Sequence, residues 1–543
     1  MAIRPSPGPA AWDPFRHRAF TLLWAATVVS NIGTGMNTVG AGWLMTTLAP
    51  DPLTVALVQV ATTAPAFLLA LPSGALADIF DRRKLLLAVN LVMALVAAVL
   101  AVLVGLGRMN ATLLLCFTFL LGAGAAFITP AWLAIVPQLV PRATLGPAIA
   151  LNSMGINVSR AIGPAVAGAL IVWLGFAAPF TVNALSFLVI VAALAWWRPA
   201  AAAGSALPVE GLGEALRNGL RYALHSAPLR AALVRGVAFF LSASAYWALL
   251  PIIAKTSLKG GASLYGVLMG CVGAGAVLGA LLMPRVQPRL GPDGTVAAGS
   301  LGTALVLAAF SLIANPYAAA AASLLAGACW IFVLSSLQVA AQLALPNWVR
   351  ARGLSLFLTL FFGTMALGSV IWGLIASVRG VDEALLIAAG LALLMLAATW
   401  RVRVGRGEAL DLAPSMHWPA PLVRLDTPQE RGPVMTMIEY RIDPPDVPAF
   451  LALMAEQAQA RRRLGAVHWW IMEDVTAPGL YVEYFVEGSW LSHLRHHERV
   501  TGADRLLQGR IWALHRGTLP PLVRHLLAPP AVGSATGGAV SED

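Results

Sequence analysis

Charged side chains are scarce in this chain. Of its 543 residues, 11% are Asp, Glu, Lys or Arg and 58% are hydrophobic, whereas soluble domains carry about 25% charged residues. This shortage excludes an ordinary soluble protein and predicts an all-α membrane protein, because helices satisfy their own backbone hydrogen bonds in lipid. The formal net charge of +11 predicts membrane topology rather than nucleic-acid binding, since most of the cations flank apolar runs.

The chain also has few cysteines, and it lacks carboxylates in the middle of its apolar runs. The three cysteines, Cys116, Cys271 and Cys329, lie inside apolar runs, with neither a disulfide framework nor a metal-site spacing. No Asp, Glu or His falls in the middle of an apolar run, although proton relays commonly use such residues. The sequence accordingly predicts no catalytic residue, no cofactor and no metal site. Met1–Arg18 lacks an apolar core, which predicts that it is not a cleavable signal.

Long apolar runs are what the chain has instead. A membrane-spanning helix needs about 20 apolar residues. Two blocks of such runs predict twelve transmembrane helices in a 6+6 arrangement, as parallel repeats in a transporter would give. The predicted spans cover residues 19–48, 53–77, 85–107, 111–137, 146–174, 179–197, 232–254, 263–284, 295–314, 316–345, 352–378 and 382–401.

Composition divides the chain into seven predicted segments. A cytoplasmic N-terminal segment, 1–18, precedes a first six-helix half, 19–197, a cytoplasmic linker, 198–231, and a second six-helix half, 232–402. A proline-rich linker, 403–433, leads to a small cytoplasmic α+β domain, 434–525, and to a disordered tail, 526–543.

The placement of positive charge sets the predicted orientation. With the N-terminus inside, the inner loops hold most of the arginines, including the Arg82–Lys84 cluster, whereas the outer loops hold only Arg108, Lys255, Lys259 and Arg379. Loops rich in Lys and Arg stay on the cytoplasmic side. The pattern predicts a multi-pass protein of the cytoplasmic (inner) membrane with both termini in the cytoplasm.

The loop after the second predicted span has a distinctive pattern, Gly74-Ala-Leu-Ala-Asp78-Ile-Phe-Asp81-Arg82-Arg83-Lys84. Asp78 can accept hydrogen bonds from a neighbouring helix N-terminus or pair with an arginine. Gly74, Leu76, Asp78, Arg82 and Arg83 resemble the signature loop of the major facilitator superfamily, with Ile79 in place of a usual cation and Asp81 in place of a usual glycine. The resemblance implies a conformational gate at Gly74, Asp78, Arg82 and Arg83. The alternative is a solvated basic hairpin.

The fifth predicted span combines Arg160 with Gly163, Pro164 and Gly168. An arginine at membrane depth is costly, so it should face the bundle interior or an aqueous cavity. It either contacts substrate or is a structural residue bonded to helix carbonyls. The glycines and the proline permit close packing and a kink, and they resemble the fifth-span motif of antiporters in the same superfamily.

A wider resemblance covers residues 15–525 approximately. It is carried by Phe15–Phe20, by Pro130–Arg142 continuing to Pro164, and by Val482–Trp490 followed by His496-His497-Glu498-Arg499. These segments are similar to the branch that includes enterobactin exporters and transmembrane secretion effectors. The similarity implies export of a siderophore or drug-like small molecule by alternating access, usually driven by proton exchange. The implied partners are a small-molecule substrate, protons and the lipid bilayer.

Several polar or aromatic residues in the spans are candidates for lining a substrate cavity. The alternative for an isolated Asn or Gln is a bridge between helices, and a lone Trp often serves packing. The candidates are Asn31, Asn37, Asn152, Asn157, Arg160, Tyr246, Trp247 and Gln338.

The C-terminal segment predicts a small cytoplasmic ferredoxin-like α+β domain. We expect strands at 434–442, 467–475, 480–486 and 510–515, with helices at 448–463 and 489–499. The domain resembles small antibiotic-biosynthesis monooxygenases but has no specific catalytic constellation. His493, His496 and His497 share a helical face. They could bind a metal, but we expect a solvated polar face there, because no cysteine or carboxylate stands at a metal-site spacing.

These features together predict a secondary active transporter rather than an enzyme, exporting a small amphipathic molecule across the cytoplasmic membrane. One alternative is an importer on the same scaffold, because the direction of transport cannot be read from a fold. The other is a membrane-anchored enzyme whose C-terminal domain carries the activity. Twelve spans are far more than an anchor requires.

Overall fold

The structure is a computed structural model that describes residues 12–79, 81–141, 144–197, 212–346, 348–405, 410–415, 417–418 and 431–529. The chain divides into two compact units. The first contains Met1–Val209, Ala231–Val339 and Ser355–Gly405, and the second contains Glu210–Arg230, Ala340–Leu354 and Arg406–Asp543.

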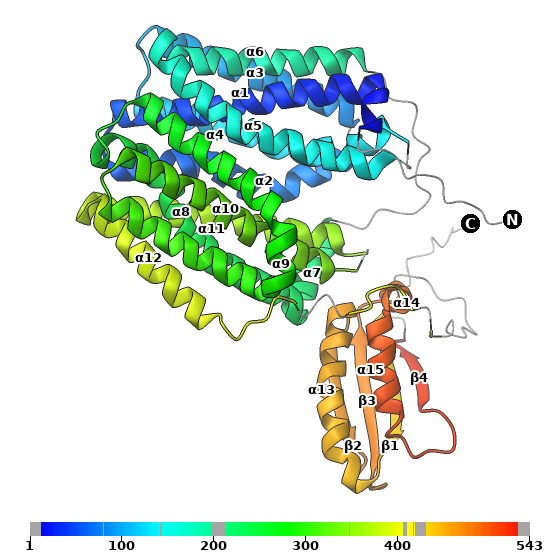
Figure 1. The fold of residues 1–543 in the computed structure, drawn as a ribbon. Helices are drawn as coiled ribbons and strands as arrows, with labels where there is room; N and C mark the ends of the chain where they lie inside the picture. Colours follow the sequence, from blue (N-terminus) through cyan, green and yellow to red (C-terminus); the bar gives the residue numbers. More distant parts are fainter. Residues whose placement is uncertain are drawn as a thin grey trace, which may run out of the picture. The chain divides into compact units, whose positions relative to one another are not determined.

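The predicted apolar runs form long helices (Figure 1). In chain order these are α1 (Arg18–Leu48), α2 (Pro52–Ile79), α3 (Arg82–Gly105), α4 (Ala111–Leu139), α5 (Leu145–Leu174), α6 (Ala177–Trp196), α8 (Ala227–Ile252), α9 (Ala262–Leu312), α10 (Pro316–Leu343), α11 (Arg350–Arg379) and α12 (Val381–Ala398). Within the part of the chain that the structure describes, eleven helices are long and apolar enough to cross a membrane.

Helix α9 differs from the other apolar helices in length. Its 51 residues are interrupted at Gly291, whose φ of 67° lies in the left-handed region that glycine adopts at little cost. Pro284, Pro288 and Pro292 lie around this break and lack the backbone N–H that a continuous helix needs. A straight helix of this length would measure about 76 Å, more than twice the roughly 30 Å of a bilayer core.

The first six helices pack on one another through apolar side chains. Helix α1 contacts α5 and α6, α2 contacts α4, and α3 contacts α4 and α6. Phe20, Leu86, Trp132, Leu151 and Leu194 belong to one buried cluster that joins five of these helices. Helix α5 also packs along α9, and this contact connects the first set of helices to the second.

The second unit contains a four-stranded antiparallel sheet (Figure 1). Strands β1 (Val434–Arg441), β2 (His468–Glu473), β3 (Leu480–Glu487) and β4 (Leu522–Leu527) have the order β2-β3-β1-β4. Helices α13 (Val447–Leu464), α14 (Trp490–Arg499) and α15 (Gly502–Trp512) lie on one face. Alternate residues of β1 and β3 are buried, as expected for a sheet with one covered face.

The closing strand is not where the sequence pattern predicted it. Residues 510–515 were expected to form a strand, but helix α15 occupies the first half of this segment and the last strand is β4. The physical reason is a capping box, in which the Thr501 side chain accepts from the Asp504 backbone and the Asp504 carboxylate accepts from the Thr501 backbone. The expected disordered tail also begins too early, because β4 extends to Leu527. Residues 530–543 lie outside the described residues.

The segment between α6 and α8 contains a further helix, α7 (Leu212–His225), which belongs to the second unit. Arg221 Nη1 donates a hydrogen bond to the Gly465 carbonyl at 2.9 Å, just after α13. Tyr222 donates through its hydroxyl to the Ala344 carbonyl at 3.0 Å, and burial raises the pKa of this phenol to about 12. The segment after α10, helix α7 and the sheet domain are therefore joined within one unit.

Candidate functional site

Arg160 occupies an enclosed but accessible position on α5. Its carbonyl oxygen lies against α9, where a Cβ atom on Gly273 would approach it to 2.6 Å. The Arg160 side chain retains exposed surface in this conformation although many protein atoms lie around it. With the residues that the structure describes, Arg160 makes no hydrogen bond or ion pair. This arrangement leaves its five N–H donors available to a bound molecule or water.

The fifth-span motif residues lie where α5 meets α1 and α9. A Cβ on Gly163 would approach the Ile32 carbonyl of α1 to 2.8 Å, and one on Gly168 would approach Gly266 Cα of α9 to 3.0 Å. The Pro164 carbonyl is equally close to Gly266. The structure therefore brings Gly163, Pro164 and Gly168 to interhelical contacts of the kind that small residues permit.

Further contacts between the two sets of helices gather at the end of the bundle where α1 finishes and α9 begins. The Trp43 and Tyr265 rings stack with centroids 6.2 Å apart. Lys255, in the π-helical turn η3 (Ile253–Ser257) after α8, donates to the carbonyl of Thr46 on α1. The Gly168–Gly266 contact lies at the same end of α5 and α9.

The candidate cavity residues fall into different environments. Asn152 is buried, and its Oδ1 accepts from Trp132 Nε1 at 3.1 Å; Asn157 donates to the Ser153 carbonyl at 3.0 Å. These two contacts match the helix-bridging and local alternatives more closely than a cavity role. Asn31 is half-buried and Gln338 is exposed.

Three other candidates carry buried polar atoms. Asn37 Oδ1 has no hydrogen-bond partner among the described residues, whereas the side chains of Tyr246 and Trp247 interact with each other. Tyr246 and Trp247 adjoin an aromatic cluster around Trp330. Trp247 lies 5.3 Å from Trp330, and Phe240 lies 5.5 Å from Trp330 and 4.7 Å from Phe361, centroid to centroid. The adjacent phenylalanines at 239–240 and 361–362 were the sequence signal from which this aromatic cluster could have been expected.

The gate loop is only partly described. The surroundings of Gly74 and the side chain of Asp78 lie outside what the structure describes. Asp81 caps α3 by accepting from the Lys84 backbone N–H at 2.9 Å. Arg83 donates from Nε to the Leu194 carbonyl and from Nη2 to the Ala195 carbonyl, both at 2.8 Å. A cation at the C-terminal end of α6 is also favoured by the helix dipole. Arg82 is half-buried.

A buried arginine, Arg235, was missed by the sequence interpretation, which singled out Arg160 within the spans. Arg235 of α8 is 3% exposed, and it donates to the Thr399 carbonyl at 3.2 and 3.3 Å and lies 3.6 Å from Asp293. Asp293 in turn accepts from the Val404 backbone at 2.8 Å. This network joins α8, α9 and the chain after α12. Arg235 lies near the start of a predicted span, and its neighbours in the sequence do not distinguish it from an ordinary cation at a span end.

The covered face of the C-terminal sheet carries two buried carboxylates. Glu483 accepts from Arg461 Nε, Tyr440 Oη and Trp469 Nε1, each at 3.0 Å. The Arg461 guanidinium also lies 4.5 Å from the Phe485 ring centre. Full pairing of both charges offsets the large cost of burying them.

The second carboxylate, Glu487, corrects the expectation of a solvated histidine face. Its oxygens lie 2.6 Å from His493 Nδ1 and 2.7 Å from His496 Nδ1, and both rings are buried. Burial alone would raise the pKa of Glu487, but His496 and His493 bring it down to about 2. Burial and neighbouring histidines lower the pKa of His497 to about 3, and burial with His493 lowers that of His525 to about 4. The sequence interpretation considered only partners on the histidine helix. It therefore missed Glu487, which ends strand β3 just before that helix.

Comparison with known proteins gives a consistent assignment. Residues 9–531 match the family described as transmembrane secretion effectors. The staphyloferrin A transporter of Staphylococcus aureus (strain NCTC 8325 / PS 47) is 23% identical over 48% of this chain, which spans 65% of that relative's length. The multidrug efflux pump Tap of Mycolicibacterium fortuitum is 27% identical over 72% of this chain and 97% of its own.

Solved structures share the helical fold. A bacterial homologue of the human lysosomal transporter Spinster, in an inward-facing and unoccupied conformation, superposes with a TM-score of 0.55 at 15% identity, covering 73% of this chain and 98% of its own. A POT family transporter in complex with a thioalcohol-conjugated peptide gives 0.60 at 12% identity, covering 71% and 96%. At such identities the likeness shows the fold alone. Because the family match spans nearly all of the sequence, this chain belongs to the transmembrane secretion effectors, a branch of the major facilitator transporters.

Proposed function

We propose that the chain is a secondary active transporter that exports a small amphipathic molecule, a siderophore or drug-like compound, by alternating access. The observation that carries the proposal is a pairing of two features. The two sets of helices are in contact at one end of the bundle, and Arg160 of α5 keeps an exposed side chain without a hydrogen bond or ion pair to the described residues. A closed end beside an accessible polar centre is what one state of such a transporter requires.

Twelve spans follow if α9 supplies two of them, one on each side of Gly291. An even number of spans puts both ends of the helical region on one side of the membrane, and the arginine-rich loops assign that side to the cytoplasm. The closed end is then the outer end, and the conformation is inward-facing. The β2-β3-β1-β4 sheet with its helices on one face fits a ferredoxin-like domain, which we assign to the cytoplasm.

Two parts of the chain would control the change of state. The Gly168–Gly266 contact closes the outer end, and it must open for release. The gate loop, through Asp78 and Arg83, stabilises the opposite closure; Arg83 already holds the end of α6. A substrate shifts this equilibrium only by binding the two states with different affinity.

The relatives named above support export of siderophores and drugs as the substrate range, and proton antiport is the proposed energy source. Within the sequence of the predicted gate, we assign Asp78 as a latch or as the proton site. Import on the same scaffold is the main competing function. Activity of the C-terminal domain as an enzyme is the other.

The direct test compares cells with and without the protein. Cells loaded with a panel of anionic siderophores, cationic drugs and neutral drugs should retain less of at least one compound when the protein is present. Collapse of the proton gradient should abolish the difference. Greater uptake in the presence of the protein would indicate an importer, and no difference for any compound would contradict the proposal.

A further inference from the structure

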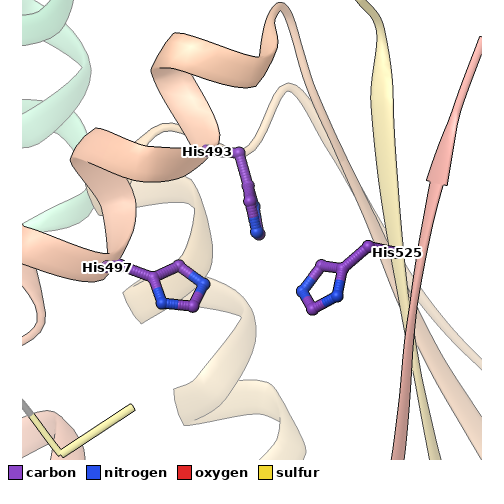
Figure 2. Close-up of side chains that lie close together, drawn as sticks. All are labelled: His493, His497 and His525. Carbon is purple, nitrogen blue, oxygen red and sulfur yellow. The ribbon is translucent and has the colours of Figure 1, made fainter. Parts of the chain in front are cut away.

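Three histidines of the C-terminal domain converge on a common point. His493 and His497 stand one helical turn apart on α14, and His525 lies on β4 (Figure 2). Their rings point toward one another, and one nitrogen of each lies within 4.8 Å of the corresponding nitrogens of the other two. The i, i+4 spacing on a helix places two imidazoles on one face, and the strand supplies the third from the opposite side.

The hydrogen bonding of His493 leaves one nitrogen prepared for a ligand. Its Nδ1 lies 2.6 Å from the Glu487 carboxylate, which can only accept, so Nδ1 carries the proton and Nε2 presents a lone pair. His493 is 1% exposed, and its Nε2 has no hydrogen-bond partner among the described residues. A buried polar atom left unpaired is costly, and an ion bound at this point would remove that cost.

Glu487 is itself held from a second side. His496 Nδ1 lies 2.7 Å from its other oxygen, so the carboxylate cannot rotate without losing a contact. A carboxylate that orients a ligating imidazole from behind is the usual outer support of a histidine metal site. His496 therefore helps to hold Glu487 in place and is not one of the three histidines that converge.

A further buried polar atom faces the same region. Thr436 of β1 pairs directly with His525 in the sheet register, and directly opposite side chains on antiparallel strands lie on the same face about 5 Å apart. Thr436 is 3% exposed, and its Oγ1 also lacks a partner in the described part of the chain. It is available to bond a water or hydroxide in the remaining position of a coordinated ion.

We propose that His493, His497 and His525 form a binding site for a first-row divalent cation, with Zn²⁺ as the best-suited ion. Neutral imidazoles suit zinc, copper, iron and nickel, and three histidines with one open position form a tetrahedral zinc site. Zinc–nitrogen distances of about 2.0–2.1 Å require nitrogens about 3.3 Å apart, so each ring must move inward by about 1 Å or less. His525 is exposed and His497 half-buried, which provides both the freedom to move and the entry route.

Zinc binding to the full-length, chelator-stripped protein in detergent tests the site. The protein should be purified through a tag without histidine and titrated with Zn²⁺ in a calorimeter. Co²⁺ should be titrated in parallel, because a tetrahedral site gives strong visible absorption. We expect one Zn²⁺ per chain. H497A and H525A should each weaken binding at least about tenfold, and E487Q should weaken it about 10- to 100-fold.

His468 is the matched control, since it lies exposed on β2 of the same domain outside the cluster; H468A should bind as the wild type does. Circular dichroism and the thermal midpoint of H497A and H525A should match the wild type, because these two side chains are the less buried ones. The H497A/H525A double variant gives the decisive comparison. Binding equal to that of the wild type, or no binding by the wild type itself, would overturn the proposal.

Discussion

The guanidinium carbon of Arg499 lies 4.1 Å from the centre of the Trp348 ring. Arg499 ends α14, which carries His493 and His497, and Trp348 lies in the segment between α10 and α11. The contact therefore ties the sheet domain to the start of an apolar helix within one unit. A cation over an aromatic face contributes about 0.5–2 kcal/mol, depending on desolvation.

Loss of this contact should loosen α14. We expect R499Q and W348L each to speed amide hydrogen exchange in α14 about fivefold, as about 1 kcal/mol implies. The double variant should add little, because both changes remove the same interaction. E498Q is the control, since Glu498 is exposed on the same helix. Exchange by mass spectrometry on the full chain measures the effect. Additive increases would show that the two residues act separately.

Breaking the buried Arg461–Glu483 pair should be far more costly. E483Q leaves the guanidinium buried without its counter-charge, and Arg461 and Glu483 side chains are 2% and 0% exposed. Such a break costs about 3–5 kcal/mol, so the slowest β3 amides should exchange more than a hundredfold faster. E439Q removes the half-exposed pair with Arg524 and should cost at most about 1 kcal/mol. Similar effects of both variants would contradict this account.

The helical framework could be predicted from the sequence, because a membrane span is fixed by about 20 apolar residues whatever surrounds it. Strands β1 to β3 were also predictable, since alternation along a half-covered sheet is a local pattern. The end of the domain was misassigned although Thr501 and Asp504 offered a capping signal.

The partners of the buried polar side chains could not be predicted in the same way. Whether Arg235 lies at a span end or in a buried network depends on Asp293 and Thr399, which are far away in sequence. The histidines of α14 have helical spacing suited to a solvated face, and their burial follows from Glu487 on the neighbouring strand. Long-range partners decide the role of a polar side chain, and sequence spacing alone does not contain them.

The Gly168–Gly266 contact predicts a specific block of transport. A Cβ on Gly266 would lie 2.8 Å from Gly168 Cα and 2.9 Å from the Pro164 carbonyl, which is too close for the backbones to hold their positions. G266V should therefore insert normally yet export at less than about a tenth of the wild-type rate, because the two helices can no longer meet. G390V is the control, since Gly390 has open space beside it.

Labelling separates a block of closure from a loss of folding. Thr46 is fully buried beside the Lys255 contact. A T46C variant without the native cysteines should react faster with an external maleimide when G266V is added. Unchanged labelling together with normal export would remove this contact from the closure mechanism.

Arg83 should act through its two hydrogen bonds and not through charge alone. R83K keeps a cation at the end of α6 but cannot hold the Leu194 and Ala195 carbonyls as the Arg fork does. We expect R83K to export at an intermediate rate and R83Q at the lowest rate, with all proteins inserted equally. K84Q, at an exposed neighbour, should export normally. Full activity of R83Q would exclude Arg83 from the gate.

Arg160→Ala tests the proposed substrate site. If the guanidinium faces the space that substrate enters, its charge favours anionic compounds, because charges close together in a partly desolvated site interact by several kcal/mol. R160A should then reduce export of an anionic siderophore about tenfold or more and leave a neutral drug within about threefold, per molecule of inserted protein. R160K should retain part of the anionic export, since lysine keeps the charge without the planar fork.

The alternative role of Arg160 gives a different pattern. An arginine that only ties α5 to neighbouring carbonyls would, on removal, lower the amount of inserted protein and reduce both substrates alike. R108A, at an exposed residue between α3 and α4, controls for a general effect of losing one positive charge. Efflux of the two substrates measured side by side in the same cells decides the matter. Equal losses for the anionic and neutral compounds, or no loss for either, would exclude Arg160 from the binding site.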